Sequence, residues 1–267
     1  MSLTITLIQT RLHWEDKAAN RAMLQQKIAS IKEKTQLVVL PEMFSTGFSM
    51  QPELLAETMD GPTVQWMREM AAIHRIILTG SLIIREGTDY FNRLIWMLPN
   101  GQYGLYDKRH RFAFAGEDQH YTAGNKRLIA SVNGWKINLQ VCYDLRFPVW
   151  ARQNPAAASP ELPAQPEYDL LINVANWPQR RSLAWKTLLQ ARAIENQCFI
   201  VGVNRVGVDG NGIDYSGDSM VIDPLGEILY HKADEEAIHT LSLHKTALEA
   251  IRQKFPFWKD ADAFRIS

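Results

Sequence analysis

The sequence contains only two cysteines, Cys142 and Cys198, in 267 residues. Two cysteines do not form a disulfide framework, so we expect reduced thiols rather than a disulfide-stabilised secreted domain. Long apolar runs are also missing, since no stretch approaches the ~18 residues that a membrane-spanning helix needs. The first residues lack the basic and apolar regions of a signal peptide. These absences predict a cytoplasmic protein that has no contact with a membrane.

Neither sign of charge is in excess, because 29 basic residues balance 29 acidic residues. A nucleic-acid partner is therefore not predicted, since such proteins carry a basic surface. The low net charge leaves little repulsion between copies of the chain, which permits self-association. Histidine pairs at metal-ligand spacing and the Cys-x-x-Cys pattern do not occur, so we predict no bound metal.

The sequence does contain strand and helix patterns that alternate from end to end. Short apolar runs typical of buried strands cover residues 36–40, 76–84, 169–174 and 198–204. Helical patterns cover residues 16–32, 61–74 and 181–196. Turn-forming pairs, Asn100-Gly101 and Asn133-Gly134, add β-hairpins, which require antiparallel strands. The pattern predicts an α/β fold with mixed sheets, in a single domain over residues 1–267.

A segment rich in alanine and proline, residues 154–166, interrupts this alternation. Its composition is typical of an exposed loop, and also of a linker between domains. Because the strand pattern resumes at residue 169, the interpretation as a loop is favoured.

Three reactive side chains each stand where a predicted strand ends. Glu42 follows residues 36–40, Lys108 follows the second arm of a hairpin, and Cys142 follows residues 135–141. Loops at the carboxyl ends of strands converge on the ligand crevice of α/β sheets, so these side chains are predicted to meet. Cys142 would be the nucleophile, Glu42 the general base and acid, and Lys108 the cation that stabilises an oxyanion.

We expect Cys142 to precede a helix, whose dipole, together with Lys108, favours the thiolate. The backbone N–H of Tyr143 would then be a second donor to the oxyanion. Each residue also has an ordinary interpretation: Cys142 as an inert core thiol, Glu42 as part of a turn, and Lys108 as part of a basic surface loop. The spacing alone leaves both interpretations open.

At these residues the sequence resembles the carbon–nitrogen hydrolase (nitrilase) superfamily over nearly its whole length. Residues 40–42 (LPE) are similar to the family's glutamate motif, residues 106–110 (YDKRH) to its lysine motif, and residues 141–148 (VCYDLRFP) to its cysteine motif. Residues 192–196 and 217–219 resemble further family signatures. The cysteine motif is most similar to the omega-amidase (2-oxoglutaramate amidase) branch, whereas true nitrilases usually carry Trp at the position of Tyr143.

The resemblance implies a four-layer α-β-β-α sandwich that pairs through its helical faces into homodimers or larger homo-oligomers. It also implies a second glutamate in the loop after the lysine, for which Glu117 matches and Asp118 competes. With the chemical roles filled by side chains, no cofactor is expected. The implied reaction is hydrolysis of the terminal amide of a small carboxylic acid, such as 2-oxoglutaramate or 2-oxosuccinamate, with water as co-substrate and a thioester intermediate. An amidohydrolase of N-carbamoyl amino acids or polyamines is an alternative, and so is a non-catalytic scaffold with a structural Cys142.

The free carboxylate of an omega-amide calls for a cation that binds it with two hydrogen bonds. Arg180 and Arg181, which follow the strand over residues 169–174, are the candidates. The exposed start of a helix would explain them equally well. We further predict that Phe44, Phe48, Trp177 and Tyr143 wall a compact pocket, although aromatic residues near strand ends often belong to the core.

Overall fold

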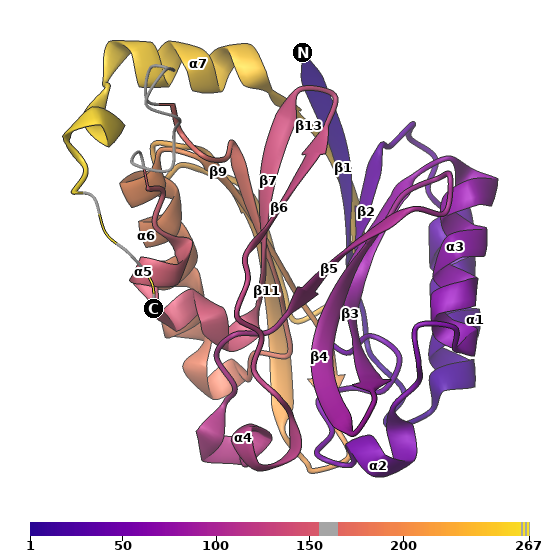
Figure 1. Ribbon diagram of the computed structural model, residues 1–267. Coiled ribbons are helices and arrows are strands. Elements are labelled where there is room, and N and C mark those ends of the chain that lie inside the picture. Colours follow the sequence, from indigo (N-terminus) through magenta and orange to yellow (C-terminus); the bar gives the residue numbers. More distant parts are fainter. Residues whose placement is uncertain (155–164, 263, 265, 267) are drawn as a thin grey trace.

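The computed structural model describes residues 1–154, 165–262, 264 and 266. The predicted loop over residues 154–166 therefore lies mostly outside the described residues. Two β-sheets face each other, and helices cover their outer faces (Figure 1). This arrangement confirms the predicted α/β fold with mixed sheets in an α-β-β-α sandwich.

The first sheet has the strand order β13-β1-β2-β3-β4-β5. Its strands are β1 (Ser2–Gln9), β2 (Leu37–Val39), β3 (Ile77–Glu86), β4 (Asp89–Met97), β5 (Tyr103–Asp107) and β13 (Ala237–His244). Strands β1, β2 and β3 are parallel, and β4 and β5 follow as antiparallel hairpin neighbours. Because β5 thus runs in the direction of β3, the carboxyl ends of β2 and β5 lie at the same edge of the sheet.

The second sheet has the order β10-β11-β9-β8-β7-β6, and β12 pairs with β11. Its strands are β6 (Leu128–Val132), β7 (Trp135–Val141), β8 (Leu170–Ala175), β9 (Phe199–Asn204), β10 (Val206–Val208), β11 (Asp214–Ile222) and β12 (Ile228–Ala233). Strands β7, β8 and β9 are parallel, which brings their carboxyl ends to one edge.

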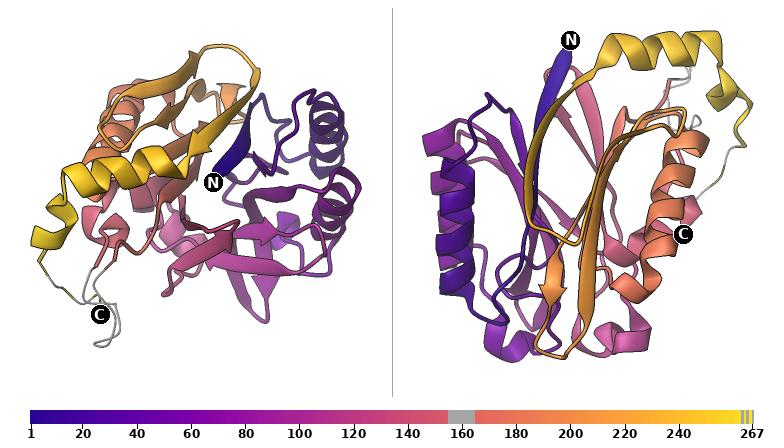
Figure 2. Two further views of the ribbon diagram at one scale, coloured as in Figure 1. Left: turned by 90° about the horizontal axis from the view of Figure 1, so that it is seen from above. Right: turned by 180° about the vertical axis from the view of Figure 1, so that it is seen from behind.

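Helices α1 (Lys17–Ala29) and α3 (Pro62–His74) cover the outer face of the first sheet, where Leu24 and Met67 share a buried cluster with Val38. Helix α6 (Ser182–Asn196) covers the second sheet through Trp185 and Leu189 (Figure 2). The shorter helices are α2 (Pro52–Leu55), α4 (Glu117–His120), α5 (Pro148–Ala151) and α7 (Lys245–Lys254). In the part of the chain that the structure describes, no helix is both long and apolar enough to cross a membrane.

The structure contains the predicted helices and strands, with small changes at their ends. Helix α1 begins one residue after Asp16, because the Asp16 carboxylate caps it by accepting from the Ala19 N–H at 2.9 Å. Helix α6 begins at Ser182, after a 3₁₀ turn over Gln179–Arg181. The short strand β10 was not predicted, since three residues carry no periodicity.

Candidate active site

Glu42, Lys108 and Cys142 come together where β2, β5 and β7 end. Glu42 and Lys108 extend from the first sheet and Cys142 from the second, so the site lies between the two sheets. Their exposed fractions are 0%, 1% and 8%, respectively. The structure therefore brings together the three side chains that strand ends predicted, in a place that largely excludes water.

Cys142 occupies a strained backbone position at the end of β7. Its φ of 47° lies in the left-handed region, which non-glycine residues rarely adopt and which costs about 1–3 kcal/mol. Cys142 is also the first residue of a 3₁₀ helix, Cys142–Arg146, so the chain turns sharply at the thiol. Tyr143 is the second residue of this helix, where backbone N–H groups have no partner within the helix.

The surroundings of Cys142 act against the thiolate that its position at a helix start was expected to favour. Burial and the carboxylate of Glu42 raise the pKa of Cys142 well above its ordinary value, although Lys108 acts to lower it. The direction of this pKa shift favours the protonated thiol, which calls for a neighbouring base to remove the proton.

Lys108 is held between two carboxylates. Its Nζ donates to Glu42 Oε1 at 2.9 Å, and to Glu117 Oε1 and Oε2 at 2.9 and 2.8 Å. Burial by itself lowers the pKa of Lys108, but Glu117 and Glu42 outweigh it and raise the pKa above the ordinary value. The ammonium group thus stays charged, and it lies 5.1 Å from the ring centre of Phe48.

Glu117, rather than Asp118, belongs to this cluster. Glu117 is fully buried at the start of α4, whereas Asp118 is exposed. Burial and the charge of Glu42 raise the pKa of Glu117, and Lys108 acts in the opposite direction. Within the described residues, no group of three or more His, Cys, Asp and Glu side chains is arranged to hold a metal ion.

Two asparagines that the sequence reasoning did not select hold Glu42 in place. Asn92 Nδ2 donates to Glu42 Oε1 at 2.8 Å, and the backbone N–H of Asn176 donates to Glu42 Oε2 at 2.7 Å. Asn176 directly follows β8, so a search of strand ends that included amides would have found it. Asn92 lies inside β4, where nothing in the sequence distinguishes it.

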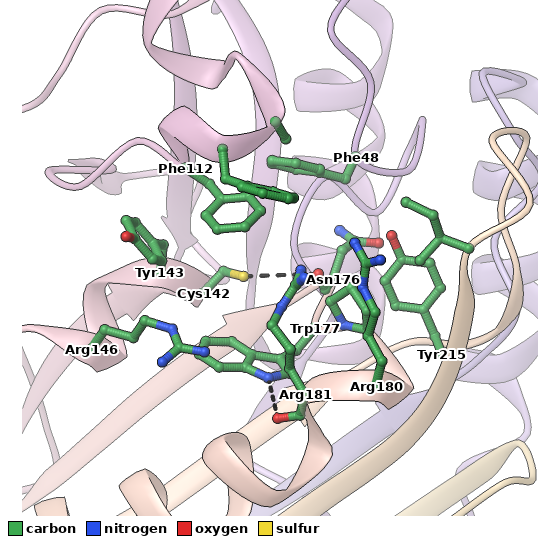
Figure 3. Close-up of a pocket in the computed structure, with 14 residues that line it drawn as sticks. Phe48, Phe112, Cys142, Tyr143, Arg146, Asn176, Trp177, Arg180, Arg181 and Tyr215 are labelled. Carbon is green, nitrogen blue, oxygen red and sulfur yellow. Dashed lines mark hydrogen bonds between the residues drawn. The ribbon is translucent and has the colours of Figure 1, made fainter.

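A cavity of about 240 Å³ opens above Cys142. Phe48, Phe112, Tyr143 and Trp177 form aromatic walls around the thiol (Figure 3). Phe44 does not belong to them: it packs in the core against Trp66, on the outer side of the first sheet. The remaining lining residues are Phe114, Ala115, Arg146, Asn176, Pro178, Arg180, Arg181, Ile213 and Tyr215.

Three guanidinium groups line this cavity (Figure 3). Arg180 and Arg181 were predicted, and they extend from the 3₁₀ turn before α6. Arg146 was missed, although it stands within the cysteine motif. Its guanidinium carbon lies 4.9 Å from the ring centre of Trp177, and that of Arg181 lies 5.0 Å from Phe112. The cavity thus combines aromatic walls with positive charge.

Comparisons with known proteins agree with this geometry. The family model for carbon–nitrogen hydrolases matches residues 4–253. Omega-amidase YafV of Escherichia coli K12 is 43% identical over 99% of this chain and 98% of its own. The 2-oxoglutaramate amidase of Bacillus subtilis is 30% identical over 97% of this chain and 98% of its own.

Solved structures share the fold along the whole chain. XC1258 from Xanthomonas campestris, a CN-hydrolase superfamily protein with an arsenic adduct in its active site, is 46% identical with a TM-score of 0.96, and each chain is covered completely. Nit3 of Saccharomyces cerevisiae, at 24% identity over 96% of this chain and 94% of its own, has a TM-score of 0.80 and supports the fold alone. The resemblance found in the sequence is thereby confirmed, and the chain belongs to the carbon–nitrogen hydrolase family.

Proposed function

We propose that this chain is an omega-amidase, which hydrolyses the terminal amide of a small carboxylic acid to the acid and ammonia. The observation that carries the proposal is the meeting of Cys142, Glu42 and Lys108 at a cavity lined by arginines. The similarity to YafV and to a 2-oxoglutaramate amidase supports the same substrate class.

In the first half-reaction, Cys142 Sγ attacks the amide carbonyl carbon while Glu42 takes the thiol proton. The raised pKa of the thiol fits this role, because the proton stays on sulfur until a base removes it. Lys108 Nζ and the Tyr143 N–H stabilise the oxyanion. Glu42 then returns the proton to the departing nitrogen, ammonia leaves, and a thioester remains on Cys142.

In the second half-reaction, Glu42 takes a proton from water as the water oxygen attacks the thioester carbonyl. The tetrahedral intermediate collapses, the carboxylic acid departs, and the proton returns to Cys142 Sγ. Glu117 keeps Lys108 oriented toward the oxyanion through its two hydrogen bonds. Side chains and water supply every proton transfer, so the scheme balances without a cofactor.

The charge of the cavity favours a monoamide such as 2-oxoglutaramate or 2-oxosuccinamate. Arg146, Arg180 and Arg181 are suited to bind the free carboxylate of such a substrate with bidentate hydrogen bonds. Phe48 and Trp177 would pack against its short carbon chain. The same charges disfavour cationic polyamine amides through repulsion. An N-carbamoyl amino acid carries a carboxylate too, so it is the competing substrate to test.

Ammonia release from a panel of amides tests this proposal. Wild-type protein and Cys142→Ala would be compared on 2-oxoglutaramate, 2-oxosuccinamate, an N-carbamoyl amino acid and a polyamine amide. We expect the two omega-amides to have the highest kcat/KM and Cys142→Ala to be inactive on all four. A preference for the carbamoyl compound would contradict the substrate assignment, and an active Cys142→Ala would contradict the mechanism.

We also propose that the chain forms a homodimer or larger homo-oligomer, in the cytoplasm, through its helical face. Leu183 on α6 and Val149 on α5 are 79% and 56% exposed, which provides apolar surface for such a contact. Light scattering coupled to size-exclusion chromatography measures the mass directly, and a monomer at micromolar concentration would contradict the pairing.

A further inference from the structure

A buried carboxylate, Asp144, joins the turn that carries Cys142 to the loop that carries Lys108. Asp144 is the third residue of the 3₁₀ helix after β7, and none of its surface is exposed. Its Oδ2 accepts from the Val141 N–H at 3.0 Å and from the Tyr106 hydroxyl at 2.7 Å. Its Oδ1 lies 2.9 Å from the His110 backbone N, which donates to it, and 2.8 Å from His110 Nδ1.

These partners flank the proposed catalytic residues on both sides. Val141 directly precedes Cys142, whose left-handed φ needs support from its surroundings. Tyr106 and His110 stand two residues before and two residues after Lys108. The Asp144 carboxylate, in the turn after β7 of the second sheet, therefore binds both ends of residues 106–110. This segment of the first sheet contains Lys108.

The side chains that bind Asp144 make further contacts of their own. Burial, together with the charge of Asp144, raises the pKa of Tyr106 well above its ordinary value, so its hydroxyl remains a donor. The Tyr106 oxygen in turn accepts from Trp150 Nε1 at 2.8 Å. The His110 ring stacks on Phe147 with 3.7 Å between ring centres and 7° between planes. Both side chains that bind Asp144 are thus held by a further contact.

The position of this link matters because the site is divided between two sheets. A thiol attack requires the reacting atoms to be aligned within about 3–3.5 Å. The two sheets already share one buried core, which includes Ile5 of the first sheet and Ile137 of the second, and Asn176 adds a polar link between them at Glu42. Asp144 adds a second polar link, at the residues that flank Lys108, so the segments that carry Glu42 and Lys108 are each tied to the second sheet.

We propose that Asp144 is a positioning residue that keeps the Cys142 turn of one sheet in register with the Lys108 loop of the other. The proposal rests on the function proposed above for Cys142 and Lys108. Asp144 is not among the residues that line the cavity, so it acts through those two residues and not on the substrate.

Asp144→Asn tests the link directly. Asparagine has nearly the same shape, but its Nδ2 cannot accept a hydrogen bond, so in either orientation of the amide one backbone N–H, that of Val141 or that of His110, loses its acceptor. Since a misplacement of about 1 Å can cost about 100-fold in rate, we expect kcat for an omega-amide to fall at least about tenfold. KM should change by less than about threefold, because the cavity wall is unaltered.

Tyr106→Phe and His110→Ala loosen the link on the lysine side alone. Alkylation of Cys142 by iodoacetamide forms no oxyanion, so displacement of Lys108 should reduce the alkylation rate much less than it reduces kcat. Asp144→Asn also removes the negative charge to which the Val141 N–H donates and should change both rates. Tyr168→Phe is the matched control, since Tyr168 is equally buried, binds the Ala151 carbonyl and lies away from the cavity.

Melting temperatures separate positioning from simple stability. If Asp144→Asn, Tyr106→Phe and His110→Ala melt earlier but keep the wild-type kcat and alkylation rate, Asp144 only stabilises the fold and the proposal is overturned. If Asp144→Asn does not fold, the other two variants decide by the same criterion. Failure of the proposed function would appear differently, as no amide hydrolysis by wild type or as activity in Cys142→Ala.

Discussion

Asn176 and Glu42 bind each other across the two sheets at the floor of the cavity. The Asn176 N–H donates to Glu42 Oε2 at 2.7 Å, and the Asn176 side-chain amide donates to the Glu42 carbonyl oxygen at 2.6 Å. Lys108 and Asn92 donate to the other carboxylate oxygen of Glu42. The carboxylate proposed as general base is therefore held at both oxygens, and its direction toward Cys142 is fixed before a substrate binds.

The two cysteines are expected to behave in opposite ways. Cys142→Ala should abolish amide hydrolysis and the thioester, which intact-protein mass spectrometry of a rapidly quenched reaction detects. Cys198 is fully buried in the core, and burial raises its pKa, so Cys198→Ala should keep turnover within about twofold and cost ~1 kcal/mol of stability. Labelling of Cys198 instead of Cys142 by iodoacetamide would contradict this assignment.

Glu42→Gln should separate alkylation from hydrolysis. The charge of Glu42 raises the pKa of Cys142, so its removal lowers that pKa and moves the midpoint of the alkylation pH profile to lower pH. Amide turnover should nevertheless fall by about 10²–10⁴-fold, because the general base is lost. Asp118→Asn, at an exposed neighbour of Glu117, should change neither measurement. A midpoint that stays in place or moves upward would be inconsistent with this account of the site.

Arg146→Gln should weaken binding of the carboxylate end of the substrate. Loss of a charged hydrogen bond costs about 1.5–3 kcal/mol, which corresponds to an increase in KM for 2-oxoglutaramate of about 10–100-fold. An amide of the same length without the carboxylate serves as the control, and its kcat/KM should not change. Equal losses for both amides would show that Arg146 supports the cavity through its contact with Trp177 rather than through the carboxylate.

Leu189 and Leu183 allow a test of packing on a single helix. Leu189 is fully buried against the second sheet, and Leu189→Ala should lower the free energy of unfolding by about 2–5 kcal/mol. Leu183 is 79% exposed, so Leu183→Ala should leave the unfolding midpoint of the isolated chain nearly unchanged. Urea denaturation followed by circular dichroism measures both. A loss for Leu183→Ala that disappears on dilution would place the proposed homo-oligomer contact on α6, whereas Leu189→Ala without effect would contradict its packing against the second sheet.

Most of the fold followed from local patterns in the sequence. The apolar runs before Glu42 and Cys142 became β2 and β7, and Asn133-Gly134 became the turn between β6 and β7. The distribution of strands between two sheets did not follow, because pairing depends on contacts between distant segments. For example, β1 and β13 pair across the whole length of the chain, with Ile5 opposite Leu241.

The sequence by itself determined which residues could do chemistry: a thiol, a carboxylate and an ammonium group, each at the end of a strand. Only the tertiary structure decided how their pKa values shift and which residues hold them in place. Burial and the charge of Glu42 raise the pKa of the Cys142 thiol, although the adjacent helix had suggested a thiolate. Asn92, Asn176, Asp144 and Arg146 acquire their importance only through partners far along the chain. A pKa and a hydrogen bond depend on distance in space and on the exclusion of water, and neither is encoded in the neighbouring residues of the sequence.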